Sequence, residues 1–480
     1  MSLKKKALNG LSWSFLIQFS SQSIGFIVTI ILARLLMPAD FGIIGIVSIF
    51  VGFANILSDS GTATSLIRNK EVSQLDYSTV FFSNLIVSVL LYILLFLLAP
   101  FIASFFEFKN IESLLKVYGL MFIVSSFTIV QSIRLNKNLD FKTQFKLLLP
   151  SLLISATVGI WMAVNGYGVW SLVIKDLVFS VLGGVQLWIY SKWRPSLVFD
   201  WKVFKYHFDF GYKLMLTEFI KKIFNDGNKI VIGKLFSITQ LGLFTRAQSM
   251  QELPSSVLFN AFNRVAFPLL AQISDDNVRL KNVYQKLVTS ISFIVLPLLM
   301  FLGVLAKPIF VVLLTEKWNE AIPYFQILIL GGIFAPLRTY NLNIRKVKGK
   351  SNLVLAFTIL ECILIGISIT TVLWFGINGI LWGLVLVYIS LTIITGYYSG
   401  KLIDYSLKEQ FQDFYPILTL SILMAIIVYV FDLFILKTKC TDWFRLIIDG
   451  FIAFLFYISF AYFFKMKSFI ELKLTFNKTV

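Results

Sequence analysis

Long apolar runs follow one another along the whole chain, and short polar segments separate them. Each run is about 20 residues long, the length that an α-helix needs to cross the roughly 30 Å hydrocarbon layer of a bilayer. The pattern predicts about fourteen transmembrane helices. Their expected ranges are 10–34, 41–66, 79–103, 112–133, 145–165, 168–190, 208–234, 240–270, 284–307, 319–341, 352–374, 377–400, 414–436 and 444–464.

The composition agrees with this reading. Of the 480 residues, 58% are hydrophobic and only 14% are charged, and no polar stretch is long enough for a separate soluble domain. We therefore predict an all-α polytopic membrane protein. The net charge of +18 would indicate nucleic-acid binding in a soluble protein. Here the basic residues lie mostly in short loops, where they set the orientation of the spans, and we expect no nucleic acid as a partner.

Lysine and arginine are distributed unevenly between the two alternating sets of loops. If the N-terminus is cytoplasmic, the cytoplasmic loops hold most of them, with clusters near residues 4–6, 192–205 and 345–350. The positive-inside rule then predicts an even number of spans and both termini in the cytoplasm.

The expected seventh span departs from the apolar pattern. At mid-bilayer each charged side chain costs about 2.5–3.5 kcal/mol, so a helix with five of them cannot present them to lipid. Its polar residues share an arc of roughly 140° at 100° per residue. We predict that this face lines a polar cavity, with an amphipathic helix lying on the membrane surface as the alternative. The residues are Glu218, Lys221, Lys222, Asn225, Asp226 and Lys229.

A weak internal repeat runs through the chain. The segment ARLLMPADFG at 33–42 returns as GKLFSITQLG at 233–242, and later matches keep the same order with offsets that rise from 200 to 211. A duplication with small insertions leaves such a trace. We predict an N-terminal lobe of six spans at 1–200, a C-terminal lobe of six spans at 201–405 in the same orientation, and two additional spans with a cytoplasmic tail at 406–480.

The repeat places the seventh span on the first. Gln18 and Gln22 align with Glu218 and Lys222, so the first span offers a neutral polar face where the seventh offers a charged one. Packing of small and polar residues between helices is the alternative for the first span. The eighth span adds further polar side chains. From these two spans we include Gln18, Gln22, Glu252 and Arg264 in the candidate substrate-binding set.

Several cations and few acids on such a face suit an anionic ligand, such as a phosphate, a diphosphate or an acidic sugar. The acids can pair with lysines three or four residues away when no ligand is bound, or can bind a coupling H⁺ or Na⁺. Beyond such an ion we expect no cofactor and no metal. Cys362 and Cys440 indicate neither a disulfide nor a metal site. The single histidine, His207, reads as a surface residue at a loop–helix boundary, and it leaves no Ser/His/Asp catalytic set.

Three segments resemble one family of transporters. They are residues 31–68, the GYGVW turn at 166–170 and FNRVAFP at 262–268. They are similar to the polysaccharide transporters of the multidrug/oligosaccharidyl-lipid/polysaccharide (MOP) superfamily, and more narrowly to Wzx-type flippases and exporters of the WzxC/TuaB kind. The resemblance covers most of residues 1–400 and fades in the last two spans. It implies two six-helix lobes around a cavity that opens alternately to each side.

The resemblance also implies a cargo: an oligosaccharide on a polyprenyl diphosphate, moved with its lipid tail in the membrane and driven by an ion or proton gradient. We therefore predict a flippase in a bacterial plasma (inner) membrane, for surface polysaccharide assembly (O-antigen, capsule or exopolysaccharide), that is not an enzyme. Its partners would be the lipid-linked oligosaccharide, membrane lipid, a glycan polymerase and chain-length proteins. The alternatives are a MATE-like drug/cation antiporter, which the lysines disfavour, and an integral-membrane polymerase or ligase, which would need a larger outer loop. A lipid II flippase is close to the leading reading and stays open.

Overall fold

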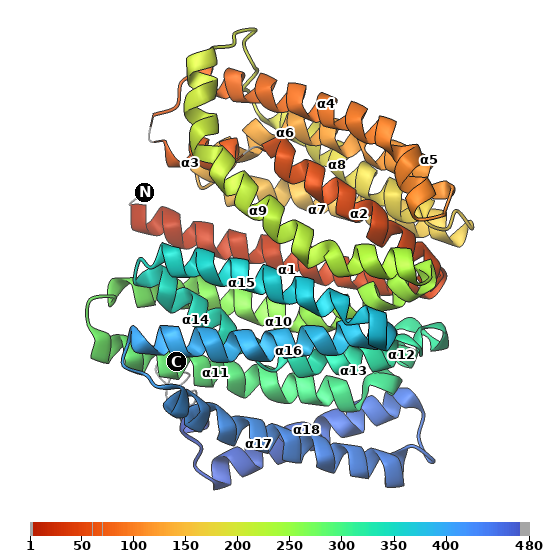
Figure 1. The fold of residues 1–480 in the computed structure, drawn as a ribbon, viewed down its shortest axis with the longest axis vertical. Coiled ribbons are helices and arrows are strands. Elements are labelled where there is room, and N and C mark those ends of the chain that lie inside the picture. The colour runs from red at the N-terminus through yellow and green to blue at the C-terminus, as the bar shows by residue number, and fades with distance from the viewer. Residues whose placement is uncertain (1–2, 60, 70, 471–480) are drawn as a thin grey trace. The chain divides into compact units, whose positions relative to one another are not determined.

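A computed structural model describes residues 3–59, 61–69 and 71–470 of the protein. Within these residues the chain is helical and contains no β-strand (Figure 1). The helices form two compact units, residues 1–242 and 243–480. The all-helical prediction is confirmed.

The first unit contains nine helices among the described residues. Its longest members, α1, α4 and α9, exceed 30 residues, and α3 and α5 are short helices of 7 and 9 residues. The bounds are α1 Leu3–Leu35, α2 Pro38–Asp59, α3 Thr62–Arg68, α4 Gln74–Phe105, α5 Asn110–Tyr118, α6 Leu120–Lys137, α7 Phe141–Val164, α8 Trp170–Tyr190 and α9 Trp201–Leu235.

The second unit starts within α10 and ends after α18. It contains a π-helical turn, η2, directly after α17. The bounds are α10 Ile238–Gln272, α11 Asn277–Val304, α12 Ala306–Leu314, η1 Glu316–Trp318, α13 Ala321–Gly332, α14 Ala335–Val347, α15 Ser351–Thr370, α16 Val372–Lys401, α17 Leu407–Phe431, η2 Asp432–Leu436 and α18 Asp442–Phe463.

Each of the fourteen expected spans corresponds to a helix or helix pair. By length and hydropathy, 11 helices could cross a membrane, or 12 if α13 and α14, bent by 41°, form one span. The other two are α9 and α10, which are 35 residues each but too polar to pass that test. The differences lie at the ends. The expected second span is broken between α2 and α3, and the seventh helix begins at Trp201 and not at 208.

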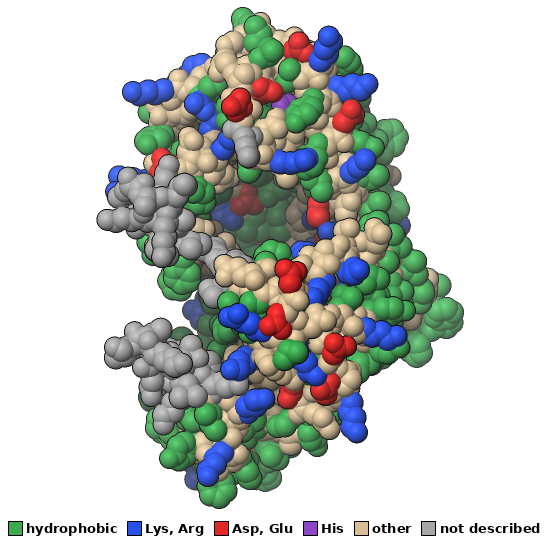
Figure 2. Space-filling view, turned by 90° about the vertical axis from the view of Figure 1, so that its left-hand side faces the viewer, with side chains coloured by type: hydrophobic (Ala, Val, Ile, Leu, Met, Phe, Trp, Pro, Cys, Tyr) green, Lys and Arg blue, Asp and Glu red, His purple; other side chains and the backbone are tan. Residues whose placement is uncertain are grey.

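The surface carries the signature of a protein in lipid. Large hydrophobic side chains remain exposed along the helices, whereas charged side chains gather on the face that Figure 2 shows and hydrophobic ones cover the flanks. In water such an apolar area would promote aggregation, whereas in a bilayer it contacts the acyl chains. Exposed examples are Leu97 and Phe101 on α4, Trp374 and Phe375 on α16, and Phe451 and Phe454 on α18.

The repeat is visible in the positions of the helix ends. α1 ends at residue 35 and α9 at 235, while α2 begins at 38 and α10 at 238. The first turns of α2 and α10 contact each other symmetrically. A Cβ atom on Gly42 would lie 1.9 Å from the Ile238 carbonyl oxygen, and one on Gly242 would lie 1.8 Å from that of Pro38. Only glycine permits this approach of two backbones.

The predicted lobes do not coincide with the compact units. α9 opens the second repeat in sequence, yet it packs on α2, α3 and α4 and folds with the first unit. The lobe boundaries at 200 and 405 describe the repeat, and they stay a prediction.

Candidate functional site

The charged face lies on α9, and its N-terminal half is firmly attached to the first unit. Asp200 caps the helix, since its Oδ1 accepts hydrogen bonds from the backbone N–H groups of Lys202 and Val203 at 2.7 and 3.0 Å. The Asp200 N–H itself donates to Thr79 Oγ1 on α4. An aspartate just before the helix is the signal by which the sequence could have placed the start of α9 correctly.

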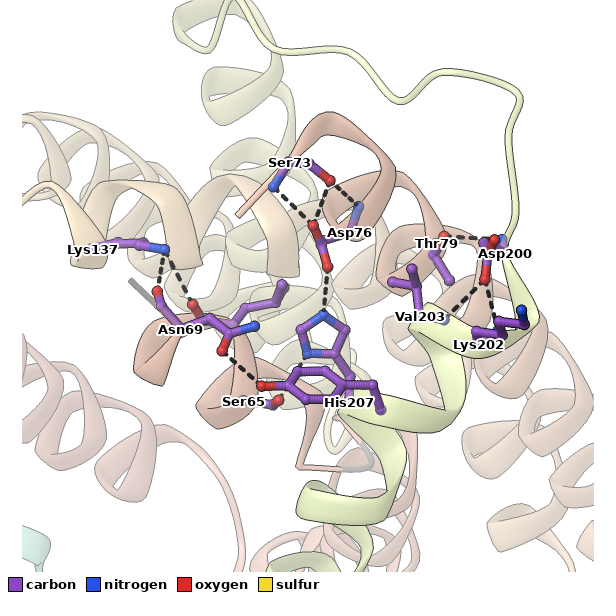
Figure 3. Close-up of polar contacts among 12 residues, drawn as sticks. Ser65, Asn69, Ser73, Asp76, Thr79, Lys137, Asp200, Lys202, Val203 and His207 are labelled. Atoms are coloured by element: carbon purple, nitrogen blue, oxygen red, sulfur yellow. Dashed lines mark hydrogen bonds and ion pairs between the residues drawn. The ribbon is translucent and has the colours of Figure 1, made fainter. Parts of the chain in front are cut away.

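His207 joins three helices (Figure 3). Its side chain is fully buried, with Nδ1 2.8 Å from Ser65 Oγ on α3 and Nε2 3.1 Å from Asp76 Oδ1 on α4. A neutral ring with its proton on Nε2 satisfies both contacts, because Nε2–H donates to the carboxylate and Nδ1 accepts from the hydroxyl. The reading of His207 as a surface residue is wrong, because α9 begins seven residues earlier than expected and carries it into the core.

The same three residues are the types found in serine-hydrolase triads, a set that sequence reasoning excluded. Ser65 is 4% exposed and His207 0%. A substrate could not reach the hydroxyl in this packed position. Asp76 also forms the capping box of α4 with Ser73, so its second oxygen is occupied by the Ser73 N–H at 2.8 Å. The arrangement holds helices together.

Farther along α9, the structure brings three of the predicted residues together. The Asp226 carboxylate, 4% exposed, lies between two ammonium groups: its Oδ2 is 2.6 Å from Lys222 Nζ and its Oδ1 is 2.8 Å from Lys229 Nζ. The lysines are partly exposed, at 31% and 23% of their side chains. One carboxylate between two cations leaves one positive charge in excess at a place that solvent can reach.

The neighbouring helix α2 makes room for this cluster. A Cβ atom on Gly52 would lie 2.4 Å from Lys222 Cε and 2.7 Å from its Nζ, so the lysine lies directly over the glycine. One turn earlier on α9, Phe219 packs on Phe53 of α2, with ring centroids 5.3 Å apart. Asn228 is also buried, and its Oδ1 has no hydrogen-bond partner among the described residues. Gly52, Phe53 and Asn228 were not expected from the sequence pattern.

The other predicted residues lie apart from this cluster. Lys221 and Glu218 form a more exposed pair at 2.8 Å, and Asn225 is exposed. Gln18 and Gln22 lie on α1, which packs on α7, and both are half-buried. Glu252 belongs to the second unit, where it accepts a hydrogen bond from Gln248 Nε2 at 2.9 Å. The side chain of Arg264 lies outside the described residues.

The end of α9 is held by a surface ion pair. Lys234 Nζ lies 2.7 Å from Glu107 Oε1, which follows α4. The hydrogen bond from Lys234 lowers the pKa of the Glu107 carboxyl, so this pair persists through neutral pH and is lost only on acidification. In the described part of the chain, no three His, Cys, Asp or Glu side chains are placed to hold a metal ion.

A repeated set of membrane-length helices, one of which carries a partly exposed ionic cluster, defines the class of protein: a multi-pass membrane protein. Comparisons with known proteins give the family. A profile described as "Polysaccharide biosynthesis protein" matches residues 31–323, and the chain belongs to that family.

The similar proteins are named for polysaccharide biosynthesis or for transport across membranes. The chain is 23% identical to the teichuronic acid biosynthesis protein TuaB of Bacillus subtilis, over 89% of each chain. It is 26% identical to the lipopolysaccharide biosynthesis protein WzxC of Escherichia coli, over 69% of this chain and 68% of WzxC. Among solved structures, the lipid II flippase MurJ in an inward closed conformation aligns with a TM-score of 0.76 at 18% identity, covering 95% of this chain and 98% of MurJ. A MATE family multidrug resistance transporter of the MOP superfamily aligns at 0.64 and 15% identity, covering 81% of this chain and 98% of that transporter. The predicted superfamily is confirmed.

Proposed function

We propose that this protein is a flippase that moves polyprenyl-diphosphate-linked oligosaccharide units from the inner to the outer leaflet of a bacterial plasma membrane. The units would serve the assembly of a surface polysaccharide. The names of TuaB and WzxC, both biosynthesis proteins for such polymers, and the flippase fold of MurJ support this proposal.

The observation that carries the proposal is the Lys222–Asp226–Lys229 cluster. Its lysines are point charges that suit the oxygens of a diphosphate or an acidic sugar. In the absence of cargo, Asp226 neutralises one of the two ammonium groups. An anionic cargo would compete with Asp226 for the lysines, so Asp226 serves as their counter-ion when the cargo has left.

A MATE-like drug/cation antiporter is the second candidate because the fold is shared. A hydrophobic cation would meet like charge beside Lys222 and Lys229, which is unfavourable where water is scarce. The excess positive charge of the cluster therefore favours the anionic cargo.

The proposal extends to the surroundings of the protein. Both termini lie in the cytoplasm, transport proceeds by alternating access with an ion or proton gradient, and no covalent step is catalysed. A glycan polymerase and chain-length proteins receive the flipped unit. The skewed distribution of basic loop residues supports the orientation.

The test combines a gene deletion with point variants. Deletion is expected to accumulate completed polyprenyl-linked repeat units, measured by mass spectrometry, and to remove the surface polymer. Lys222→Ala or Lys229→Ala should lower complementation by about ten- to a hundredfold, the equivalent of losing about 1.5–3 kcal/mol from a charged hydrogen bond. Both variants should fold, because Asp226 keeps one lysine partner.

Lys116→Ala is the matched control. Lys116 pairs with Glu112 one turn away on α5, also within the first unit, at 2.6 Å. Its removal should leave transport unchanged. Wild-type transport by both cluster variants would refute the site, and unchanged glycans with altered drug sensitivity in the deletion strain would favour the antiporter.

A further inference from the structure

The last helix pair contains a second ionic cluster, far along the chain from α9 and outside the sequence repeat. Arg445 on α18 binds Asp432 through two parallel hydrogen bonds, Nε to Oδ1 and Nη2 to Oδ2, both 2.7 Å long. Its Nη1 also donates to Asp442, at the start of α18. Arg445 and Asp432 are 9% and 8% exposed. The arginine is therefore already committed to two carboxylates.

A third carboxyl group lies beside this pair without a visible partner. Asp449 is 0% exposed, and both of its carboxyl oxygens are buried with no hydrogen bond among the described residues. It lies one turn after Arg445 in the buried stripe of α18, which continues through Ala453, Tyr457 and Ala461. The charged groups that act on it are Asp432 and Arg445. The other helices that pack on α18 are α17, α12 and α11. Their charged residues are Lys408, Glu409 and Asp413 on α17, the exposed Lys307 on α12, and Arg279, Lys281 and Lys286 on α11.

The backbone is unusual at the same place. Residues 432–436 form a π-helical turn, which starts at Asp432. Single π-turns are rare, and they are often found where a helix positions a functional side chain. Asp432 is the first residue of this turn, where it binds Arg445 and lies beside Asp449.

These charges do not balance if every group is ionised. One guanidinium would then face three carboxylates, and the Asp449 charge would be buried without a hydrogen bond, a state that proteins avoid. A proton on Asp449 removes that charge and supplies the O–H that can donate to Asp432. Two facing carboxyl groups that share one proton are the known solution to this conflict.

We propose that Asp449 is a proton-binding site, at which a proton taken up from solvent is held between the Asp449 and Asp432 carboxyl groups. The site is independent of the anion-binding face on α9.

The test is infrared spectroscopy of the purified full-length protein in lipid nanodiscs near neutral pH. We expect a carbonyl band of a protonated carboxylic acid that shifts in D₂O and is lost in Asp449→Asn. The amide has the shape of the neutral acid, so the variant should fold. Asp442→Asn is the matched control, because Asp442 also binds Arg445 but is 32% exposed, and it should keep the band.

A second variant tests the sharing. In Asp432→Asn, Arg445 loses its main partner and becomes available to Asp449, which should then ionise, so that the band disappears although Asp449 is present. Identical spectra of the wild type and Asp449→Asn would overturn the site, and a band that persists in Asp432→Asn would overturn the sharing. Neither infrared result depends on transport, so the test of the proposed function with the Lys222 and Lys229 variants is a separate experiment.

Discussion

Individual buried polar residues are informative in this protein because most of the surrounding side chains are apolar. Three buried residues occupy three different environments. His207 has a serine hydroxyl and an aspartate as hydrogen-bond partners, and Asp226 lies between two lysines. Asp449 lies beside another aspartate and an arginine. An unpaired polar group in lipid costs several kcal/mol, so each environment specifies what its residue does. His207 anchors, Asp226 keeps two lysines in place, and Asp449 is left to take up a proton.

At this scale we predict that His207→Ala destabilises the first unit. Ser65 and Asp76 would lose a buried partner, at a cost of about 1–3 kcal/mol. Thermal unfolding in detergent, followed by tryptophan fluorescence, should show a lower melting temperature. Tyr206→Phe is the control, since it removes only the exposed hydrogen bond to Asn69, and should melt near the wild type. Equal melting of His207→Ala and the wild type would show that the anchor is dispensable.

Among the elements, α9 resolves a conflict between charge and membrane. It is too polar to count as a span by hydropathy, yet it packs along α2 and α4, and its charges are grouped into ion pairs. Pairing lowers the cost of burying each charge and lets the helix join the bundle. Its packing favours a bundle helix over one that lies on the membrane surface. At 1.5 Å per residue, α9 is about 52 Å long, so it extends beyond the hydrocarbon layer.

The crossing of the two repeated turns gives a prediction for the elements. Gly42→Val should destabilise the protein by about 1–3 kcal/mol or more, because the new side chain meets the Ile238 backbone, which cannot move as a side chain can. Gly25→Val is the matched control: it has the same change on α1, where nothing lies within 4 Å of the added Cβ. Melting temperatures of the two variants should separate by several degrees, and if they agree, the close approach does not matter for stability.

Over the whole molecule, the described spans are helical because a helix satisfies every backbone group within the membrane. Fourteen expected segments became helices or helix pairs. The two most polar segments, α9 and α10, lie next to each other in sequence, at the start of the second repeat. The proposed transport cycle and the proposed orientation belong to this scale, because they require the entire set of spans.

The orientation can be tested with a native cysteine. Cys440, partly exposed, lies in the turn before α18, which the proposed topology places outside the cell. A membrane-impermeant maleimide should label it in intact cells and should not label Cys440→Ser. In a Cys440→Ser background, Ser351→Cys at the exposed start of α15 should be labelled only after permeabilisation. The reverse pattern would invert the topology.

The sequence predicted the helical class, the fourteen segments that correspond to helices or helix pairs, the repeat and the charged face of the seventh segment. These follow from periodicity and composition, which are local properties of the chain. It misplaced what depends on a helix end: an error of seven residues at the start of α9 turned the buried His207 into a surface residue. The sequence pattern also placed no candidate site residue in the last two spans, because they lie outside the repeat.

By itself, then, the sequence determined that this chain is a repeated set of membrane helices with a concentration of lysines on one of them, because lipid selects apolar segments of fixed length. Only the tertiary structure decided which polar groups meet. Asp226 lies between two lysines on its own helix. The other contacts join different helices: Gly52 leaves space for Lys222, and His207 binds Ser65 and Asp76. Asp432 likewise lies beside Asp449 of another helix. Such contacts depend on packing between distant segments, which no local pattern encodes.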